Sequence, residues 1–135
     1  MKPSLQPGIT LTTQLTVDRD RTISFMGEES RVYATPKLLY DIEMACRDLL
    51  LAHLDEGEDS VGTRVELDHI AATLLGMSVE ITVTVAELSG RAVTLEVQAR
   101  DSVEPICRGR HSRFIVDVAK TAQRLALKGQ KAASL

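Results

Sequence analysis

Two ionisable residues occupy apolar positions on two consecutive predicted elements. The segment TPKLLYDIEMACRDLLLAHL has helical periodicity, and Glu43 lies in the apolar row that contains Leu39 and Cys46. In the next segment, VGTRVELDHIA, strand alternation puts His69 in the inward row of odd-numbered residues that begins at Val61. Burying a charged group is costly unless the group is paired, and paired groups often have shifted pKa values. We therefore expect Glu43 and His69 to form a site.

A carboxylate and an imidazole in one site can perform general acid–base or nucleophilic catalysis. The Glu43 carboxylate can activate a water molecule or attack an acyl carbon directly. The His69 imidazole can orient that carboxylate and protonate a leaving group. The alternative is that the two side chains only satisfy each other, or nearby backbone groups, within the fold. The residue pattern alone leaves both interpretations open.

The helix that carries Glu43 is predicted to run from Thr35 to about His53. The pair Thr35-Pro36 is typical of a helix start, because a threonine hydroxyl can cap the first turn and proline needs no hydrogen-bond partner there. Capping alone would explain Thr35. The apolar face of the helix is broad enough to be largely enclosed by other elements.

Strand-like segments surround this helix in the sequence. One lies within residues 8–17, and a charged loop over residues 18–31 separates it from the helix. After the helix, four strands and a short helix are predicted at residues 61–71, 79–88, 92–100, 106–116 and 118–127. No helix separates the late strands, which favours an antiparallel meander with a tight hairpin at Ser89-Gly90. We predict an α+β fold in which one antiparallel sheet wraps around one long central helix.

Length and sheet organisation predict a single domain that forms a homodimer or a higher oligomer. The 135 residues suffice for one domain over 1–135, with its core at 8–118 and a tail at 129–135 that we expect to fray. A sheet with one covered face leaves an edge unprotected. A second copy of the chain can cover that edge.

Composition excludes several classes of function. The formal net charge of -3 and the 3% aromatic content, with no Trp, argue against nucleic-acid partners and acidic membranes. No segment is long and apolar enough to cross a membrane, so we expect a cytoplasmic protein. Cys46 and Cys107 have neither CxxC nor zinc spacing, which predicts buried free thiols. The scattered histidines predict no metal site, and no cofactor motif is present.

The last predicted strand, ICRGRHSRFIV, concentrates basic residues. Alternation puts Gly109, His111 and Arg113 on one side, and Arg108 and Arg110 on the other. Arginine side chains bind phosphate oxygens well, so Arg108 and Arg110 are candidate contacts for the phosphates of a nucleotide-bearing ligand. The alternative is a charged edge strand that forms salt bridges with acidic neighbours.

Four segments together resemble one enzyme family. These are VYATPKLLYDIEMACRDLL, GTRVELDHIAATLLGMSVEITVTVAEL, GRAVTLEVQARD and CRGRHSRFIV. They are similar to the fluoroacetyl-CoA thioesterase family and its wider bacterial thioesterase-like relatives, over roughly residues 32–116. The resemblance implies a hotdog fold and hydrolysis of an acyl-CoA thioester, with coenzyme A present only as part of the substrate. It also implies a homodimer.

The resemblance assigns roles to five residues. It implies that Thr35, Glu43 and His69 are catalytic, so it selects the two residues that the apolar patterns single out. It implies that the Gly62 amide lies near the acyl carbonyl, where it can receive the developing oxyanion. It also implies a substrate-site role for Arg113, which can pair with Glu43 or reach the CoA phosphates.

One segment departs from the family pattern. The loop before the helix reads FMGEESRVYAT and has Glu29 and Arg31 where the fluoroacetyl-specific enzyme has an apolar lid. This predicts a small or medium acyl group other than fluoroacetyl. Two other functions remain open at this point. One is a non-hydrolytic module that binds acyl-CoA or another small ligand, and the other is a structural dimer that binds neither.

Overall fold

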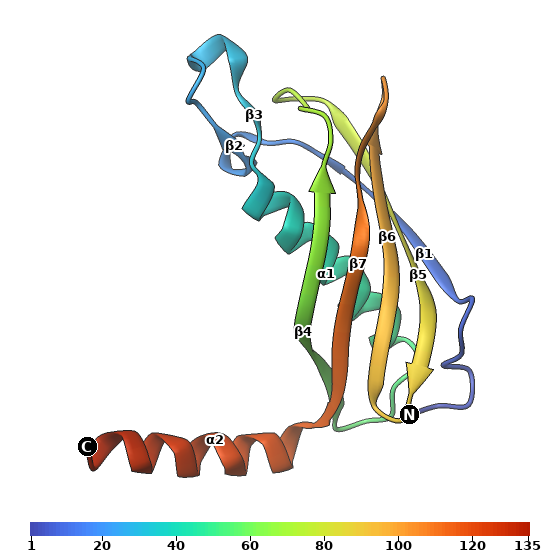
Figure 1. Ribbon diagram of the computed structural model, residues 1–135, viewed down its shortest axis with the longest axis vertical. Helices are drawn as coiled ribbons and strands as arrows, with labels where there is room; N and C mark the ends of the chain where they lie inside the picture. The colour runs from blue at the N-terminus through green and yellow to red at the C-terminus, as the bar shows by residue number, and fades with distance from the viewer.

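One long helix packs against one face of a five-stranded sheet in the computed structural model, which describes all 135 residues (Figure 1). This helix, α1, spans Thr35–Leu51 and ends two residues before the predicted end. Its buried side consists of apolar residues at helical spacing: Leu38, Ile42, Ala45, Cys46, Leu49 and Leu50. The predicted α+β class and central helix are confirmed.

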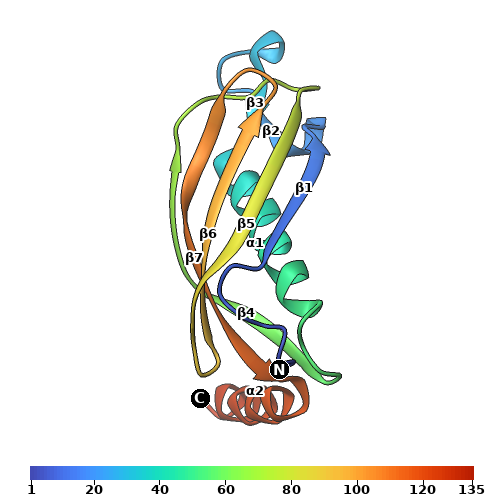
Figure 2. The ribbon, with the colours of Figure 1, turned by 90° about the vertical axis from the view of Figure 1, so that its right-hand side faces the viewer.

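The sheet is entirely antiparallel. Its strands follow the spatial order β1 (Thr10–Thr16), β5 (Ser78–Ser89), β6 (Ala92–Asp101), β7 (Pro105–Asp117) and β4 (Glu58–His69), as Figure 2 shows. The predicted hairpin joins β5 to β6. A small ribbon of β2 (Thr22–Ile23) and β3 (Val32–Tyr33) lies near the start of α1.

The prediction of a simple four-strand meander is wrong for β4. This strand pairs with β7 at the far edge of the sheet, not with β5, which follows it in the sequence. The chain must therefore cross three strand spacings, about 14 Å. Residues 70–77 connect the two strands and are long enough for that crossing, because an extended residue spans about 3.3 Å. As a result β4 has a free edge.

A β-bulge divides β4 into two parts. Even-numbered residues such as Gly62 face inward before the bulge, and odd-numbered residues such as His69 face inward after it. Gly62 pairs with Arg113, but the next registered pair is Arg64 with Ser112, so one extra residue is inserted. After the bulge, His69 pairs with buried Cys107 in the inward row, as predicted. Before the bulge the inward position is Gly62, and Val61 is exposed. The predicted uniform row from Val61 to His69 is therefore wrong in its first part.

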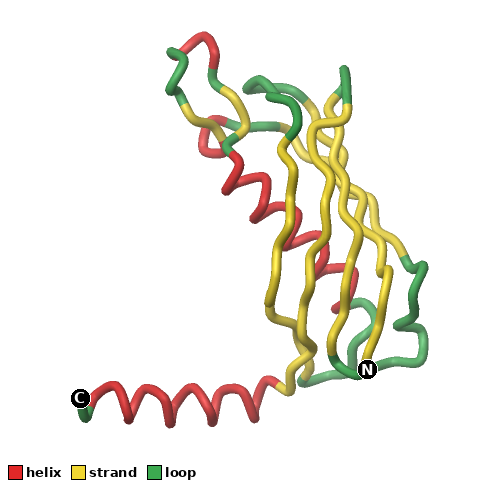
Figure 3. Tube along the Cα trace, viewed as in Figure 1, coloured by secondary structure: helices red, strands yellow, loops and turns green.

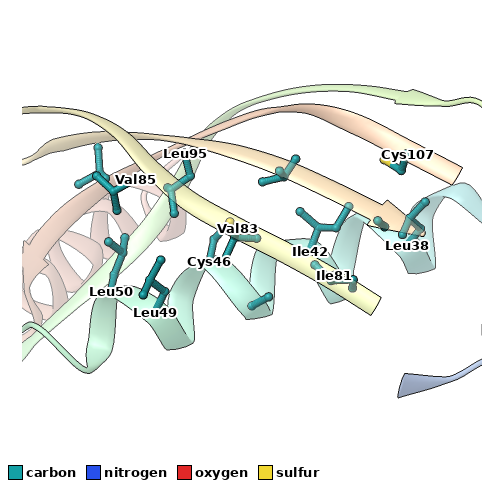
Figure 4. Packing of buried hydrophobic residues seen from close by; sticks show 14 of the residues in the cluster. Leu38, Ile42, Cys46, Leu49, Leu50, Ile81, Val83, Val85, Leu95 and Cys107 are labelled. Atoms are coloured by element: carbon teal, nitrogen blue, oxygen red, sulfur yellow. The ribbon is translucent and has the colours of Figure 1, made fainter. Parts of the chain in front are cut away.

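The core lies between α1 and the inward rows of the sheet. Figure 4 shows residues such as Ile42 and Leu50 of α1 facing Ile81, Val83 and Leu95 of the sheet. The free thiols of Cys46 and Cys107 are buried in this layer, as predicted. Burial raises the pKa of Cys46 to about 12 and that of Cys107 to about 11, so neither thiol is a nucleophile at neutral pH.

The second helix, α2 (Val118–Ala133), leaves the body of the protein after β7 (Figure 3). It includes residues 129–133, which were expected to fray. The reason is local: alanine, lysine and glutamine are good helix formers, and together they outweigh the single Gly129. No helix in the protein is both long and apolar enough to cross a membrane.

Candidate active site

Thr35 and His69 meet at the end of the molecule where α1 begins and β4 ends. Thr35 Oγ1 lies 2.8 Å from His69 Nδ1. The predicted capping role of Thr35 is wrong, because Ala34 occupies the N-cap position and no side chain caps the helix. Thr35 is instead the first residue of α1, and its hydroxyl points to the histidine. The two residues are thus brought together as a pair.

His69 is a neutral base with one ring nitrogen available. Its Nε2 atom is buried and has no hydrogen-bond partner. Burial lowers the pKa of His69, and a backbone contact with Ala71 opposes this effect more weakly. A buried polar atom without a partner costs free energy and is often explained by a ligand. At neutral pH this imidazole can therefore accept or donate a proton at a bound substrate.

Glu43 lies at a second position, further along α1. Its Oε2 atom is 3.4 Å from Nη1 of Arg113, and its side chain is 32% exposed. The inward position opposite it on β4 is Gly62, where an added Cβ atom would lie 3.1 Å from Glu43 Oε2. The predicted neighbours Glu43, Gly62 and Arg113 are thus brought together. The carboxylate is partly open to solvent and can meet a substrate.

Arg113 is buried, and three different groups hold its guanidinium. Its Nε donates to Ser60 Oγ at 2.7 Å, its Nη2 donates to the Ser60 carbonyl at 2.8 Å, and its Nη1 donates to His111 Nε2 at 3.1 Å. Burial lowers the pKa of Arg113, and Glu43 opposes this shift. Of the two predicted contacts of Arg113, the structure shows the one with Glu43.

His111 lies beside Arg113 and Gly62, although no sequence pattern singled it out. Its Nδ1 lies 2.8 Å from the Arg64 carbonyl, so Nδ1 carries the proton and Nε2 accepts from Arg113. Burial lowers the pKa of His111, and the neighbouring Arg113 cation adds to this effect. The sequence feature that could have identified His111 is its position between Gly109 and Arg113 in the inward row of the last strand.

Glu43 and His69 do not contact each other within one chain. Thr35 and Glu43 are eight residues apart on α1, which corresponds to about 12 Å along the helix axis. Each residue has its own partner, His69 with Thr35 and Glu43 with Arg113. The predicted contact in which His69 orients Glu43 is not formed within one chain. One protomer therefore contains two separate groups, Thr35 with His69 and Glu43 with Arg113, which we call the half-sites.

Arg108 and Arg110 lie on the opposite face of the sheet. Both are exposed, whereas their neighbours His111 and Arg113 are buried on the side of α1. Arg110 Nη2 forms an ion pair with Glu96 at 3.1 Å. The structure therefore does not bring these two arginines to the half-sites.

We expect the protein to lose stability on mild acidification. The folded-state pKa values of His69 and His111 are both lowered, so the unfolded chain binds protons more readily at these residues. Their contribution is present above about pH 6.5, the usual pKa of histidine, and is lost as the pH falls through the folded-state values. Urea unfolding between pH 7 and pH 5 measures this loss.

Carboxylates such as Asp59 and Asp101, whose pKa values are lowered, change protonation only below this pH range. A His111→Gln variant should show a flatter pH dependence, and an unchanged slope would contradict the assignment.

Two glycine substitutions should separate activity from folding. In Gly62→Ala the new Cβ atom would lie 3.1 Å from Glu43 Oε2 and 3.1 Å from Cε1 of buried His111, so we expect kcat/KM to fall about tenfold or more, with a smaller loss of stability than in the second variant. In Gly109→Ala the new Cβ atom would lie 1.9 Å from the Glu66 backbone oxygen. That clash should destabilise the fold by about 2 kcal/mol or more. Thermal unfolding and thioester kinetics on both variants check this difference. Equal losses of stability would refute it.

The fold and the polar groups on its covered side are typical of one class of protein. A long helix against one antiparallel sheet, with a carboxylate and a neutral histidine on the covered side, is the hotdog-fold architecture of thioesterases. A Thermus thermophilus member of the thioesterase superfamily has the same fold, with a TM-score of 0.89 at 26% identity, covering 98% of this chain and 99% of that one.

Sequence comparison identifies the family within this class. The profile of the family described as fluoroacetyl-CoA-specific thioesterase matches residues 17–119. The fluoroacetyl-CoA thioesterase of Streptantibioticus cattleyicolor is 30% identical over 127 residues, which is 89% of this chain and 91% of that protein. A solved structure of a fluoroacetyl-CoA thioesterase gives a TM-score of 0.84 at 28% identity, covering 93% of this chain and 98% of that one. The chain belongs to the fluoroacetyl-CoA-specific thioesterase family and is a thioester hydrolase.

Proposed function

We propose that this enzyme hydrolyses a small or medium acyl-CoA other than fluoroacetyl-CoA, in a homodimer whose sites combine residues of both chains. The observation that carries the proposal is the buried, unpaired Nε2 of neutral His69 beside Thr35, which is the state required of an acid–base group at pH 7. Family membership supplies the reaction class.

The chemistry follows from the groups present. Glu43 either removes a proton from water as the water oxygen bonds to the acyl carbon, or attacks that carbon itself and forms a mixed anhydride that water then cleaves. The carbon–sulfur bond breaks, and Nε2 of neutral His69 accepts a proton from solvent and passes it to the departing CoA thiolate. Glu43 releases to solvent the proton that it took from water, so both residues return to their starting states. Thr35 holds the imidazole through Nδ1. The Gly62 N–H is proposed to receive the negative charge on the acyl oxygen.

A dimer through β4 is proposed because one protomer separates the two half-sites. The outer edge of β4 is unpaired, and Val61 and Val65 on this strand are exposed. Antiparallel pairing of two β4 strands about a twofold axis near Val65 would place His69 of one chain beside Gly62 of the other. Gly62 adjoins Glu43, so both halves of the site would come together at the interface.

The loop before α1 supports an acyl group other than fluoroacetyl. Arg31 Nη2 binds Glu28 at 2.9 Å, and Arg19 Nη2 binds the same carboxylate at 3.0 Å, which lowers the pKa of Glu28 to about 2. Phe25 is 86% exposed. The loop is thus organised by ion pairs, not by an apolar cluster. The related enzyme was crystallised, as a variant, with fluoroacetate and CoA.

A thiol-release screen tests this proposal. We expect at least one non-fluorinated acyl-CoA, among chain lengths from acetyl to octanoyl, to give a kcat/KM equal to or above that of fluoroacetyl-CoA. A preference for fluoroacetyl-CoA of about a hundredfold or more would overturn the proposed selectivity. Thermal stabilisation by CoA without thiol release from any substrate would instead indicate the non-hydrolytic binding module.

A further inference from the structure

Helix α2 has no partner within its own chain. None of its residues is buried, and the hydrogen bond that joins its start to the sheet runs from Val118 N to the Gly57 carbonyl. Figure 1 shows α2 running roughly at right angles to the strands and projecting past β4, and Figure 2 shows it end-on beneath the sheet. A 16-residue helix is only marginally stable by itself in water. A surface on which α2 packs would therefore stabilise it.

Five apolar or small residues of α2 form one continuous stripe. Their spacing of three and four residues puts them on one side of the helix: Val118, Ala122, Leu125, Gly129 and Ala132. We call these five residues the α2 stripe. The basic residues Lys120, Arg124, Lys128 and Lys131 gather on another side, and α2 contains no acidic residue. Leu125 is 61% exposed, and the small residues of the stripe would allow close approach to a partner.

A second exposed apolar surface lies at the opposite end of the molecule. It consists of Ile70, Leu74 and Leu75 in the β4–β5 connection, together with Val103 in the β6–β7 turn, and we call it the apolar end. The two segments are tied together, because Thr73 Oγ1 donates to Asp101 Oδ2 at 2.9 Å, and Asp101 Oδ1 accepts from the Val103 amide. Ile70 directly follows His69, so the apolar end adjoins the Thr35–His69 pair.

The topology of the sheet relates these two surfaces. Asp117, the residue before α2, is registered with Glu58, the first residue of β4. Antiparallel pairing of β4 with a second β4 places the first residues of one strand beside the last residues of the other. The start of α2 would then lie beside Ile70 of the partner subunit. The helix is about 24 Å long, enough to cross roughly five strand spacings.

We propose that α2 is an arm that docks on a second copy of this chain, with the α2 stripe against the apolar end of the partner subunit. By twofold symmetry each chain gives one arm and receives one. The arm covers the end of the partner that carries Thr35 and His69, and so forms one wall of that acyl-CoA site. This inference rests on the β4 dimer of the proposed function. It accounts for both unpartnered apolar surfaces with one contact.

Matched substitutions on the two sides of α2 test the arm. We expect Leu125→Asp, in the α2 stripe, to raise the dimer dissociation constant at least about tenfold, because two copies of a buried leucine are lost. Its KM for acyl-CoA should rise as well. Leu127→Asp, on the opposite side of the same helix and 57% exposed, should change neither value. Sedimentation equilibrium and thiol-release kinetics measure these effects. Equal behaviour of the two variants would overturn the proposal.

Cross-linking gives a readout that does not depend on activity. A chain carrying Leu125→Cys and Leu74→Cys should be joined to a second chain by a short bismaleimide, because α2 points away from its own apolar end. Cys46 and Cys107 are buried and should not react. A chain with Leu127→Cys and Leu74→Cys should cross-link much less. A covalent dimer from a protein that hydrolyses no acyl-CoA would support the docking of α2 and contradict the proposed function. No covalent dimer, from a protein that hydrolyses acyl-CoA, would reject the arm alone.

Discussion

A Glu43→Gln variant should lose at least about a hundredfold in kcat/KM for every acyl-CoA that the native enzyme hydrolyses. The substitution keeps the size of the side chain and its ability to accept a hydrogen bond from Arg113, but the amide can neither take a proton from water nor attack the acyl carbon. The 3.4 Å contact with Arg113 and the room left by Gly62 should therefore persist. Thiol release measured under kcat/KM conditions checks the result.

A control on the same helix makes this result specific. Asp48 is exposed on α1 and its side chain makes no hydrogen bond, so Asp48→Asn should retain native rates. Thermal unfolding should show that Glu43→Gln is folded, since the side chain is partly exposed and Arg113 keeps its bonds to Ser60 and His111. A folded Glu43→Gln enzyme with native turnover would remove Glu43 from the mechanism.

Mixing two inactive variants should restore activity if each site uses both chains. His69→Gln should also lower kcat/KM about a hundredfold, because the glutamine side chain cannot exchange a proton with the leaving thiolate. A mixed dimer of Glu43→Gln and His69→Gln chains would then contain one site with both substitutions and one native site. After unfolding and refolding an equimolar mixture, we expect about a quarter of native activity, because half of the dimers are mixed.

The same experiment distinguishes the alternative arrangement. If each site took Glu43 and His69 from one chain, every site in the mixture would carry one substitution, and activity would stay at the level of the separate variants. The native enzyme taken through the same refolding gives the reference rate. His53→Gln, which alters a histidine bonded to Ser4 far from both half-sites, is the matched control for His69→Gln.

Most elements could be predicted from the sequence, because each helix or strand buries one face against the core and that burial sets the spacing of its apolar residues. The apolar side of α1 and the inward rows of β5, β6 and β7 follow directly from periodicity. The same reasoning placed Glu43 in an apolar row, and Gly109, His111 and Arg113 on one face of the last strand. The inward position of His69 was correct as well, since it lies after the bulge.

Several features depended on the tertiary structure. Strand alternation assumes an unbroken two-residue period, and a bulge inserts one residue into it. The bulge at Gly62/Arg64 and the exposure of Val61 therefore could not be predicted. Thr35 has the right residue type for a cap, and only the approach of β4 to the start of α1 gives its hydroxyl a different partner.

The sequence by itself determined which residues of this protein can do chemistry, because a carboxylate and an imidazole stand out wherever the pattern requires apolar residues. The tertiary structure decided how they are grouped, with His69 beside Thr35 and Glu43 beside Arg113. The physical reason is distance, because the eight residues of α1 from Thr35 to Glu43 span about 12 Å. A local sequence pattern cannot predict which strand residue will lie beside each of them.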